Sequence, residues 1–363
     1  MTKTFLPSLR LAAPLLALGL ACTAFGTAHA AEPLLPPAGV QAAAGQDAVR
    51  IIDIRDPKAY GERHIPGALN APYGKWRGPA TNPGELPELP KLTELVQSLG
   101  LTPANHAIVV SSGADATDFG AAARVYWTLK LLGLKELSVL NGGMKAWNEQ
   151  KLPQDNEAVK VARSSYQPQL DTSLIATREE VGQHVRLSNA ALVDSRPDAF
   201  YQGKTRAPAA KISGTLPGAQ QLDFNQWFVP GTSTFVDTAT AKQIAAKVRR
   251  EQGQDMVAFC NTGHWAATDW FGLSEVAGLP GVKLYAGSMV DWTQQADAPP
   301  MANQPGRAES LAYDAKQWWE KKFKYTPPET LRAFPLEGGR RHRLGAPAPR
   351  RLLPGVSGFG ACR

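Results

Sequence analysis

The sequence predicts an α/β protein with two tandem domains, each a mainly parallel sheet flanked by helices. The prediction rests first on a set of motifs that occurs twice in the same order. In each copy, short β-branched runs alternate with segments of helical periodicity, such as 121–132 and 266–276. A length of 363 residues is also enough for two domains of ordinary size. With 43% hydrophobic and 20% charged residues, the composition excludes disordered and collagen-like classes.

The repeat is visible in strands, turns and a Pro-Gly-Ala motif. An apolar run ends in an Asp-x-Arg turn in both copies, and a later apolar strand leads into a loop and a helix. The matching pairs are 51–55 with 192–196, 66–68 with 217–219, 107–110 with 256–259, and 143–147 with 288–292. Offsets of 141 to 151 positions indicate a duplicated domain rather than a short-repeat solenoid.

Five segments follow from this repeat and from composition. Between the copies the chain is polar and lacks periodicity, which is typical of a linker, and Thr177 with Glu180 predicts a capping box where the second copy begins. The expected segments are a signal peptide (1–30), a first domain (31–153), a linker (154–172), a second domain (173–300) and a C-terminal extension with a basic disordered tail (301–363).

The net charge of +7 is concentrated at the two ends. Residues 1–10 carry two of the positive charges and residues 338–363 carry six, with no acids in either segment, so the remaining body has a net charge of −1. A nearly neutral body gives no indication of a nucleic-acid partner, and a short basic tail is a weak basis for one.

The N-terminus has the pattern of a cleaved signal peptide. Lys3 and Arg10 precede an apolar run over 11–25, and 28–30 (AHA) supplies small residues before Ala31. The run is too short for a stable membrane span, and the sequence contains no other apolar stretch of the length that a span needs. We therefore expect a periplasmic or secreted protein, processed after residue 30.

If the protein is exported as predicted, its cysteines can form disulfides, because the compartments outside the cytoplasm are oxidising. Cys22 lies in the expected signal peptide, which leaves Cys260 and Cys362. A bridge between these two and a free reactive thiol at Cys260 both remain open. The six histidines show no ligand spacing with cysteines or acids, so we predict no metal and no cofactor.

Cys260 occupies the most informative position. It follows the strand 256–259 and opens a loop, Asn261, Thr262, Gly263, His264 and Trp265, that leads into a helix. Unpaired N–H groups and the helix dipole at such a place favour a thiolate and bind an anion, which suits nucleophilic sulfur chemistry. The first copy has serine there, and its loop over 111–120 looks four residues longer.

Each of these residues also has a structural interpretation. Cysteine at a strand end is often a small buried hydrophobe. His264 is interpreted as a loop residue in preference to a base, and Trp265 as a packing side chain. The carboxylates Asp53 and Asp194 are expected to cap neighbouring loops.

Four basic residues of the second copy are candidates for anion binding. Three of them lie in a stretch whose default interpretation is a solvated loop. These candidates are Arg196, Lys204, Arg206 and Lys211.

The Asp-x-Arg turn, the Pro-Gly-Ala motif, the 141–143 (NGG) turn before a Trp and the Cys260 loop together resemble the rhodanese sulfurtransferase family in its tandem form, over about 31–300. The resemblance implies two rhodanese-like domains, a non-catalytic first domain, and a persulfide on Cys260 cradled by the amides of 261–265. It also implies a small sulfur-containing anion as donor and cyanide or a thiol as acceptor.

Two departures leave the donor open. Thiosulfate-using members of the family end the loop with a basic residue and mercaptopyruvate-using members with a hydroxyl residue, whereas this chain has Trp265. Ala199 stands near a position where the family commonly has arginine. Lys204, Arg206 or Lys211 could compensate.

These features favour an exported thiosulfate-type sulfurtransferase. The alternative is a sulfur carrier that serves one protein acceptor and reacts poorly with free donors. A phosphatase is set aside because position 266 is Ala where phosphate binding needs Arg. A redox role has weak support, since only Cys362 could resolve an oxidised Cys260.

Overall fold

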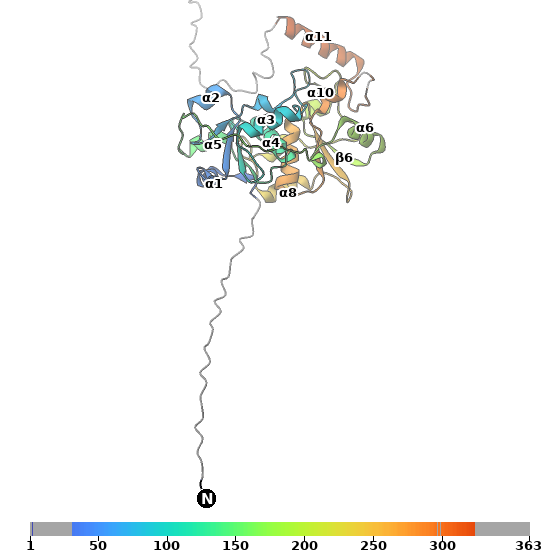
Figure 1. Ribbon diagram of the computed structural model, residues 1–363. Coiled ribbons are helices and arrows are strands. Elements are labelled where there is room, and N and C mark those ends of the chain that lie inside the picture. The colour runs from blue at the N-terminus through green and yellow to red at the C-terminus, as the bar shows by residue number, and fades with distance from the viewer. Residues whose placement is uncertain (1, 3–30, 296, 298, 324–363) are drawn as a thin grey trace, which may run out of the picture.

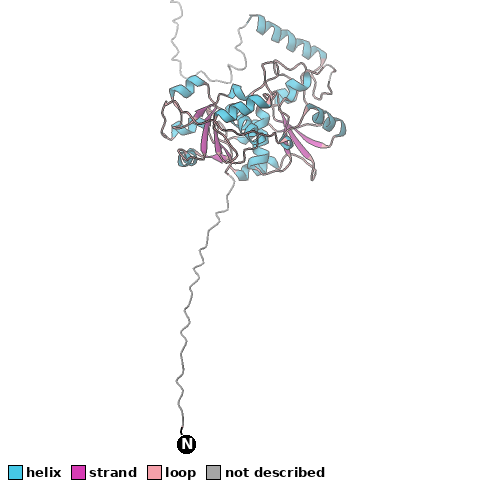
Figure 2. Cartoon of the chain, viewed as in Figure 1, coloured by secondary structure: helices cyan, strands magenta, loops and turns pink. Residues whose placement is uncertain are grey.

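The computed structural model describes residues 2, 31–295, 297 and 299–323, and its strands form two parallel sheets that lie side by side (Figures 1 and 2). The signal-peptide prediction, apart from Thr2, and the basic tail with Cys362 lie outside the described residues. Among the helices in the described part, none is long and apolar enough to cross a membrane.

The first sheet has five strands in the order β1-β5-β4-β2-β3. Its strands are β1 (Leu34–Leu35), β2 (Val49–Asp53), β3 (Leu69–Asn70), β4 (His106–Val110) and β5 (Leu137–Leu140). Its helices are α1 (Pro37–Ala43), α2 (Pro57–Glu62), η1 (Tyr73–Trp76), α3 (Leu89–Ser98), α4 (Ala116–Leu131) and α5 (Gly143–Glu149).

The second sheet has four strands in the order β7-β6-β8-β9. Its strands are β6 (Ala190–Asp194), β7 (Gln220–Gln221), β8 (Asp255–Phe259) and β9 (Val282–Leu284). The helical elements are η2 (Thr172–Leu174), α6 (Arg178–Leu187), α7 (Asp198–Tyr201), η3 (Phe224–Trp227), α8 (Thr238–Ala245), α9 (Trp265–Trp270) with the π-helical η4 (Phe271–Val276), α10 (Ser288–Thr293) and α11 (Arg307–Phe323).

The duplication is visible in the pairing of the central strands, although the first sheet has one strand more. β2 pairs with β4 over five residues, from Val49 with His106 to Asp53 with Val110, and β6 pairs with β8 over five residues in the same way. All pairings within both sheets are parallel, which confirms the predicted α/β class. The capping box at Thr177 and Glu180 is also present.

The expected difference in loop length is wrong. Five residues separate strand from helix in both copies, 111–115 after β4 and 260–264 after β8. The helices differ instead, because α4 spans 16 residues whereas α9 and η4 together span 12. A comparison of letters alone could not separate a longer loop from a longer helix.

A single cluster of buried apolar side chains extends through both domains and includes Cys260. Two smaller clusters cover the outer faces of the sheets, one beneath α1 and α5 and the other beneath α6 and α10. Helix α4 packs on β4 and β5 of its own sheet and on α9 of the second domain. The contact between the domains is therefore part of the core.

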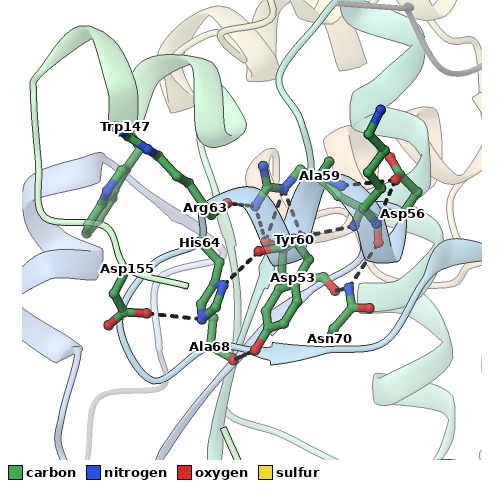
Figure 3. Close-up of polar contacts among 12 residues, drawn as sticks. Asp53, Asp56, Ala59, Tyr60, Arg63, His64, Ala68, Asn70, Trp147 and Asp155 are labelled. Atoms are coloured by element: carbon green, nitrogen blue, oxygen red, sulfur yellow. Dashed lines mark hydrogen bonds and ion pairs between the residues drawn. The ribbon is translucent and has the colours of Figure 1, made fainter. Parts of the chain in front are cut away.

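The segment between the domains lies on the first domain. His64 is buried against Tyr60, with ring centroids 3.9 Å apart, and its Nε2 lies 3.2 Å from Asp155 Oδ1 (Figure 3). The same nitrogen lies 3.1 Å from the Glu157 carbonyl oxygen. Further along, the Tyr166 hydroxyl donates to the Leu132 carbonyl. These contacts anchor the segment on the surface of the first domain.

Candidate active site

Cys260 directly follows β8, an inner strand of the second sheet, and its exposed fraction is 0%. Ligands of parallel sheets bind beyond the carboxyl ends of strands, which is where this residue lies. It is the only cysteine in the part of the chain that the structure describes, and it is free. The thiol is thus fully buried at the carboxyl end of the strands, where ligands of parallel sheets bind.

Ser288, at the start of α10, fixes the loop that begins at Cys260. Its Oγ accepts hydrogen bonds from Cys260 N at 3.0 Å and Gly263 N at 3.1 Å, and donates to the Tyr285 carbonyl at 2.8 Å. The Met289 N–H also donates to the Cys260 carbonyl. Sequence reasoning missed Ser288 in this role, although it had matched 288–292 with 143–147.

The other N–H groups of the loop have no such partner. Within the described residues, no protein acceptor pairs with the backbone N–H groups of Asn261, Thr262, His264, Trp265 and Ala266. Unpaired donors in a loop that opens a helix favour bound negative charge. The structure therefore brings the predicted residues 261–265 together, with Gly263 N–H already used by Ser288.

Gly263 is required by the close contact between the domains at this loop. Its φ is +65°, and a Cβ atom there would lie 2.3 Å from the Ala286 carbonyl oxygen and 2.5 Å from Arg124 Nη1. Arg124 comes from α4 of the first domain and donates to the Gly263 carbonyl at 3.2 Å. The first domain therefore contacts the cysteine loop directly.

His264 links the two domains. Its Nε2 lies 2.7 Å from the Thr117 carbonyl oxygen, which can only accept, so we assign the proton to Nε2. Its Nδ1 then accepts from the Tyr73 hydroxyl at 2.8 Å. Burial, followed by the nearby positive charge of Arg77, lowers the His264 pKa to about 3. A neutral imidazole with both nitrogens engaged holds the interface and is a poor general base.

Trp265 packs within its own domain. Its ring stacks on Phe224 at 4.9 Å with an interplanar angle of 6°, and it meets Phe200 edge-on at 5.7 Å. The indole N–H is buried and has no acceptor within the described residues. This agrees with the interpretation of Trp265 as a packing side chain.

Arg196 is 2% exposed, and its hydrogen bonds stay within the second domain. Its Nε and Nη2 bind both carboxylate oxygens of Asp194, at 2.8 and 2.6 Å, and Nη1 reaches Asn261 Oδ1 at 3.3 Å. The Asp194 carboxylate also accepts the Arg196 N–H, which confirms its expected capping role. Asp53 binds Arg55 in the same way. Arg196 thus positions Asn261, and its guanidinium N–H groups already donate to protein acceptors.

The other three basic candidates make contacts away from the loop. Lys204 pairs with Asp198 at 3.3 Å and Arg206 with Asp314 at 2.6 Å. Lys211 Nζ donates to the Gln294 carbonyl at 3.4 Å. No contact in the described structure brings these three cations to the Cys260 loop, and their role in anion binding stays a prediction.

The corresponding loop of the first domain contains Ser111, and a carboxylate of the same domain binds one of its N–H groups. Asp118 Oδ2 accepts the Gly113 N–H at 2.6 Å, and burial raises the Asp118 pKa. A side chain of the protein thus uses an amide in the loop that corresponds to the one after Cys260. In the described part of the chain, no group of three or more His, Cys, Asp or Glu side chains could hold a metal ion.

A family model for the rhodanese-like domain matches the chain twice, over residues 37–150 and 177–295. The chain is 28% identical over 244 residues to human 3-mercaptopyruvate sulfurtransferase, covering 66% of this chain and 80% of that protein. It is 29% identical over 249 residues to thiosulfate sulfurtransferase of Cricetulus griseus, with coverage of 66% and 80%.

The fold is similar to that of solved structures. A 3-mercaptopyruvate sulfotransferase of Escherichia coli, SseA, superimposes with a TM-score of 0.61 at 21% identity and covers 71% of this chain and 98% of its own. The anaerobic ergothioneine biosynthesis enzyme from Chlorobium limicola gives 0.63 at 20%, with coverage of 75% and 70%. Two family matches on two parallel sheets, together with relatives that are sulfurtransferases, place the chain in the rhodanese family as a protein with two rhodanese-like domains.

Proposed function

We propose that the chain is an exported sulfurtransferase that moves a sulfane sulfur from thiosulfate or a similar donor to cyanide or a thiol. The observation that carries the proposal is Cys260 at the end of an inner parallel strand, followed by five N–H groups without a protein acceptor among the described residues. These donors can stabilise negative charge on a sulfur attached to Cys260.

The reaction is a double displacement. The Cys260 thiolate attacks the outer sulfur of thiosulfate, the sulfur–sulfur bond of the donor breaks, and sulfite leaves with the bonding electron pair. The resulting persulfide carries one negative charge. Cyanide then attacks the terminal sulfur, thiocyanate leaves, and the Cys260 thiolate is regenerated.

Turnover assays with thiosulfate and with 3-mercaptopyruvate test which of the two the protein uses as sulfur donor. Purified protein should transfer sulfur to cyanide, and Cys260→Ser should lose the activity. Since relatives of both kinds match about equally, both donors should be tried at equal concentration. Full activity of the Cys260→Ser variant would overturn the proposal.

A sulfur-carrier role is the second candidate, and the complete burial of Cys260 favours it. A thiol that is 0% exposed meets free donors only when the surrounding side chains move. A carrier would form one persulfide per chain and turn over slowly with cyanide, whereas an enzyme would turn over many times. A protein acceptor of the sulfur fits this candidate best.

Export is proposed from the N-terminal pattern and has one supporting contact. The Ala31 backbone nitrogen donates to Glu136 Oε2 at 2.7 Å. Cleavage after residue 30 would make this nitrogen a charged ammonium group and the bond an ion pair. N-terminal sequencing of protein recovered from the periplasm or medium should begin at Ala31; an intact N-terminus in the cytoplasm would contradict export.

A further inference from the structure

Two arginines of the first domain lie beside the Cys260 loop without acidic partners. Arg124 is 0% exposed, donates to the carbonyls of Gly263 and Gly84, and lies 4.9 Å from the Trp127 ring. Arg77 is half-buried and donates to the Tyr73 hydroxyl at 2.8 Å. No described carboxylate forms an ion pair with either guanidinium.

Such an arrangement is costly for the protein alone. A buried cation without a counterion costs several kcal/mol of folding free energy. Burial, followed by the positive charge of Arg77, lowers the Arg124 pKa to about 9. The two cations of the first domain therefore repel one another, and an anion bound near both would relieve both costs.

The Cys260 thiol lies in the second domain, on the loop that Arg124 contacts from the first domain. The negative charge of a Cys260 thiolate raises the pKa of Arg124, whereas the positive charge of Arg77 lowers it. The same thiolate raises the pKa of the Tyr73 hydroxyl. The Gly263 carbonyl, which Arg124 binds, belongs to the same loop as Cys260. The thiolate is thus within electrostatic reach of the first-domain cations.

In the described part of the second domain, neither the loop nor the four basic candidates supply a free cation beside Cys260. The loop residues 261–265 include no lysine or arginine, and His264 is neutral. Arg196 is bound to Asp194, and the remaining three candidates contact residues elsewhere. The positively charged side chains found beside the loop therefore belong to the first domain, and they would add to the N–H groups of the loop.

We propose that Arg124 is the counterion of the Cys260 thiolate and that Arg77, whose guanidinium is held in place by the Tyr73 hydroxyl, binds the anionic end of the donor. The donor class is then a small molecule with a negatively charged oxygen group next to its transferable sulfur. This inference rests on the proposed function for the identity of the donor. It also explains how a loop ending in Trp265 can serve an anionic substrate.

Anion binding is tested in a chain that cannot transfer sulfur. Titration calorimetry would measure thiosulfate binding to Cys260→Ser, to Cys260→Ser with Arg77→Gln, and to Cys260→Ser with Arg50→Gln. Arg50 is a matched control, since it is a half-buried first-domain arginine that donates only to backbone carbonyls. We expect Arg77→Gln to weaken binding about tenfold or more, as for a charge-assisted hydrogen bond. Equal affinities in the three proteins would overturn the assignment of Arg77.

The role of Arg124 is tested by the ultraviolet absorbance of the thiolate at neutral pH, taken as a difference from Cys260→Ser. Arg124→Met should lower this signal severalfold, whereas Arg124→Lys, which keeps the charge, should restore most of it. An unchanged signal in folded Arg124→Met would overturn the assignment. If Arg124 had only a structural role, Arg124→Met would change the unfolding free energy and leave the thiolate signal unchanged.

Arg77-dependent anion binding in a wild-type protein that forms no persulfide would contradict the proposed function and leave this inference standing.

Discussion

Tyr73 of the first domain donates its hydroxyl proton to Nδ1 of His264 in the second domain, across 2.8 Å. The same hydroxyl accepts from Arg77, and the other ring nitrogen of His264 donates to the Thr117 carbonyl. A continuous chain of hydrogen bonds therefore joins the first domain to the loop that carries Cys260. The first domain has serine in place of the cysteine in its own loop, and it contacts the Cys260 loop of the second domain.

The neutral state of His264 makes stability depend on pH. Its folded pKa is about 3 and an unfolded histidine titrates near 6.5. Between these values the unfolded chain binds a proton that the folded chain does not, so stability falls as pH decreases through this window. From pH 7 to pH 5 this group should cost about 2 kcal/mol of unfolding free energy.

His264→Gln should remove this dependence. The glutamine amide can accept from Tyr73 and donate to the Thr117 carbonyl, but it does not titrate. Urea unfolding of both proteins at the two pH values should show a smaller loss of stability in the variant. Equal losses would contradict the neutral, buried state of His264.

Gly263→Ala should destroy the loop conformation. The alanine Cβ would approach the Ala286 carbonyl oxygen to 2.3 Å in a backbone with φ of +65°. Gly253→Ala is the matched control, with φ of +78° and open space around the new Cβ. We expect the control to lose about 1 kcal/mol and Gly263→Ala to lose clearly more, together with sulfur transfer. Similar losses in both variants would show that the contact with Ala286 and Arg124 is absent.

Ser288→Ala should leave two buried N–H groups, those of Cys260 and Gly263, without an acceptor. At about 1–3 kcal/mol for each of the two unsatisfied groups, the loss of unfolding free energy should be about 2–6 kcal/mol. Ser233→Ala removes a single hydrogen bond of another buried serine, to the Gly113 carbonyl, and is expected to cost less. The two variants are compared by denaturant unfolding and by the rate of persulfide formation. A Ser288→Ala protein as stable and as fast as Ser233→Ala would show that Ser288 does not hold the loop.

The sequence contained enough to predict the sheets and the place of Cys260 between a strand and a helix. Strands with β-branched residues, a repeated Asp-x-Arg turn and a cysteine between strand and helix are local patterns, and local patterns survive without knowledge of the fold. The capping box at Thr177 was predictable for the same reason. The equal loop lengths were not, because four extra residues in α4 look the same in the sequence as four in the loop before it.

The placement of Tyr73 and Arg124 beside the Cys260 loop was beyond the sequence. Tyr73 and Arg124 lie more than 130 positions before Cys260, and only the docking of α4 on α9 brings them to the loop. One signal did exist. Arg124 interrupts an apolar helical segment in which almost every side chain is buried, and a charge in such a place commonly has a functional partner.

The central claim is that Cys260 accepts sulfur, and intact mass tests it most directly. The mature protein is treated with thiosulfate, desalted and weighed, then treated with cyanide and weighed again, with Cys260→Ser as the control. The account predicts the mass of one added sulfur atom, its removal by cyanide, and no addition to the variant. An unchanged mass after thiosulfate, 3-mercaptopyruvate and polysulfide alike, or an equal addition to Cys260→Ser, would contradict it.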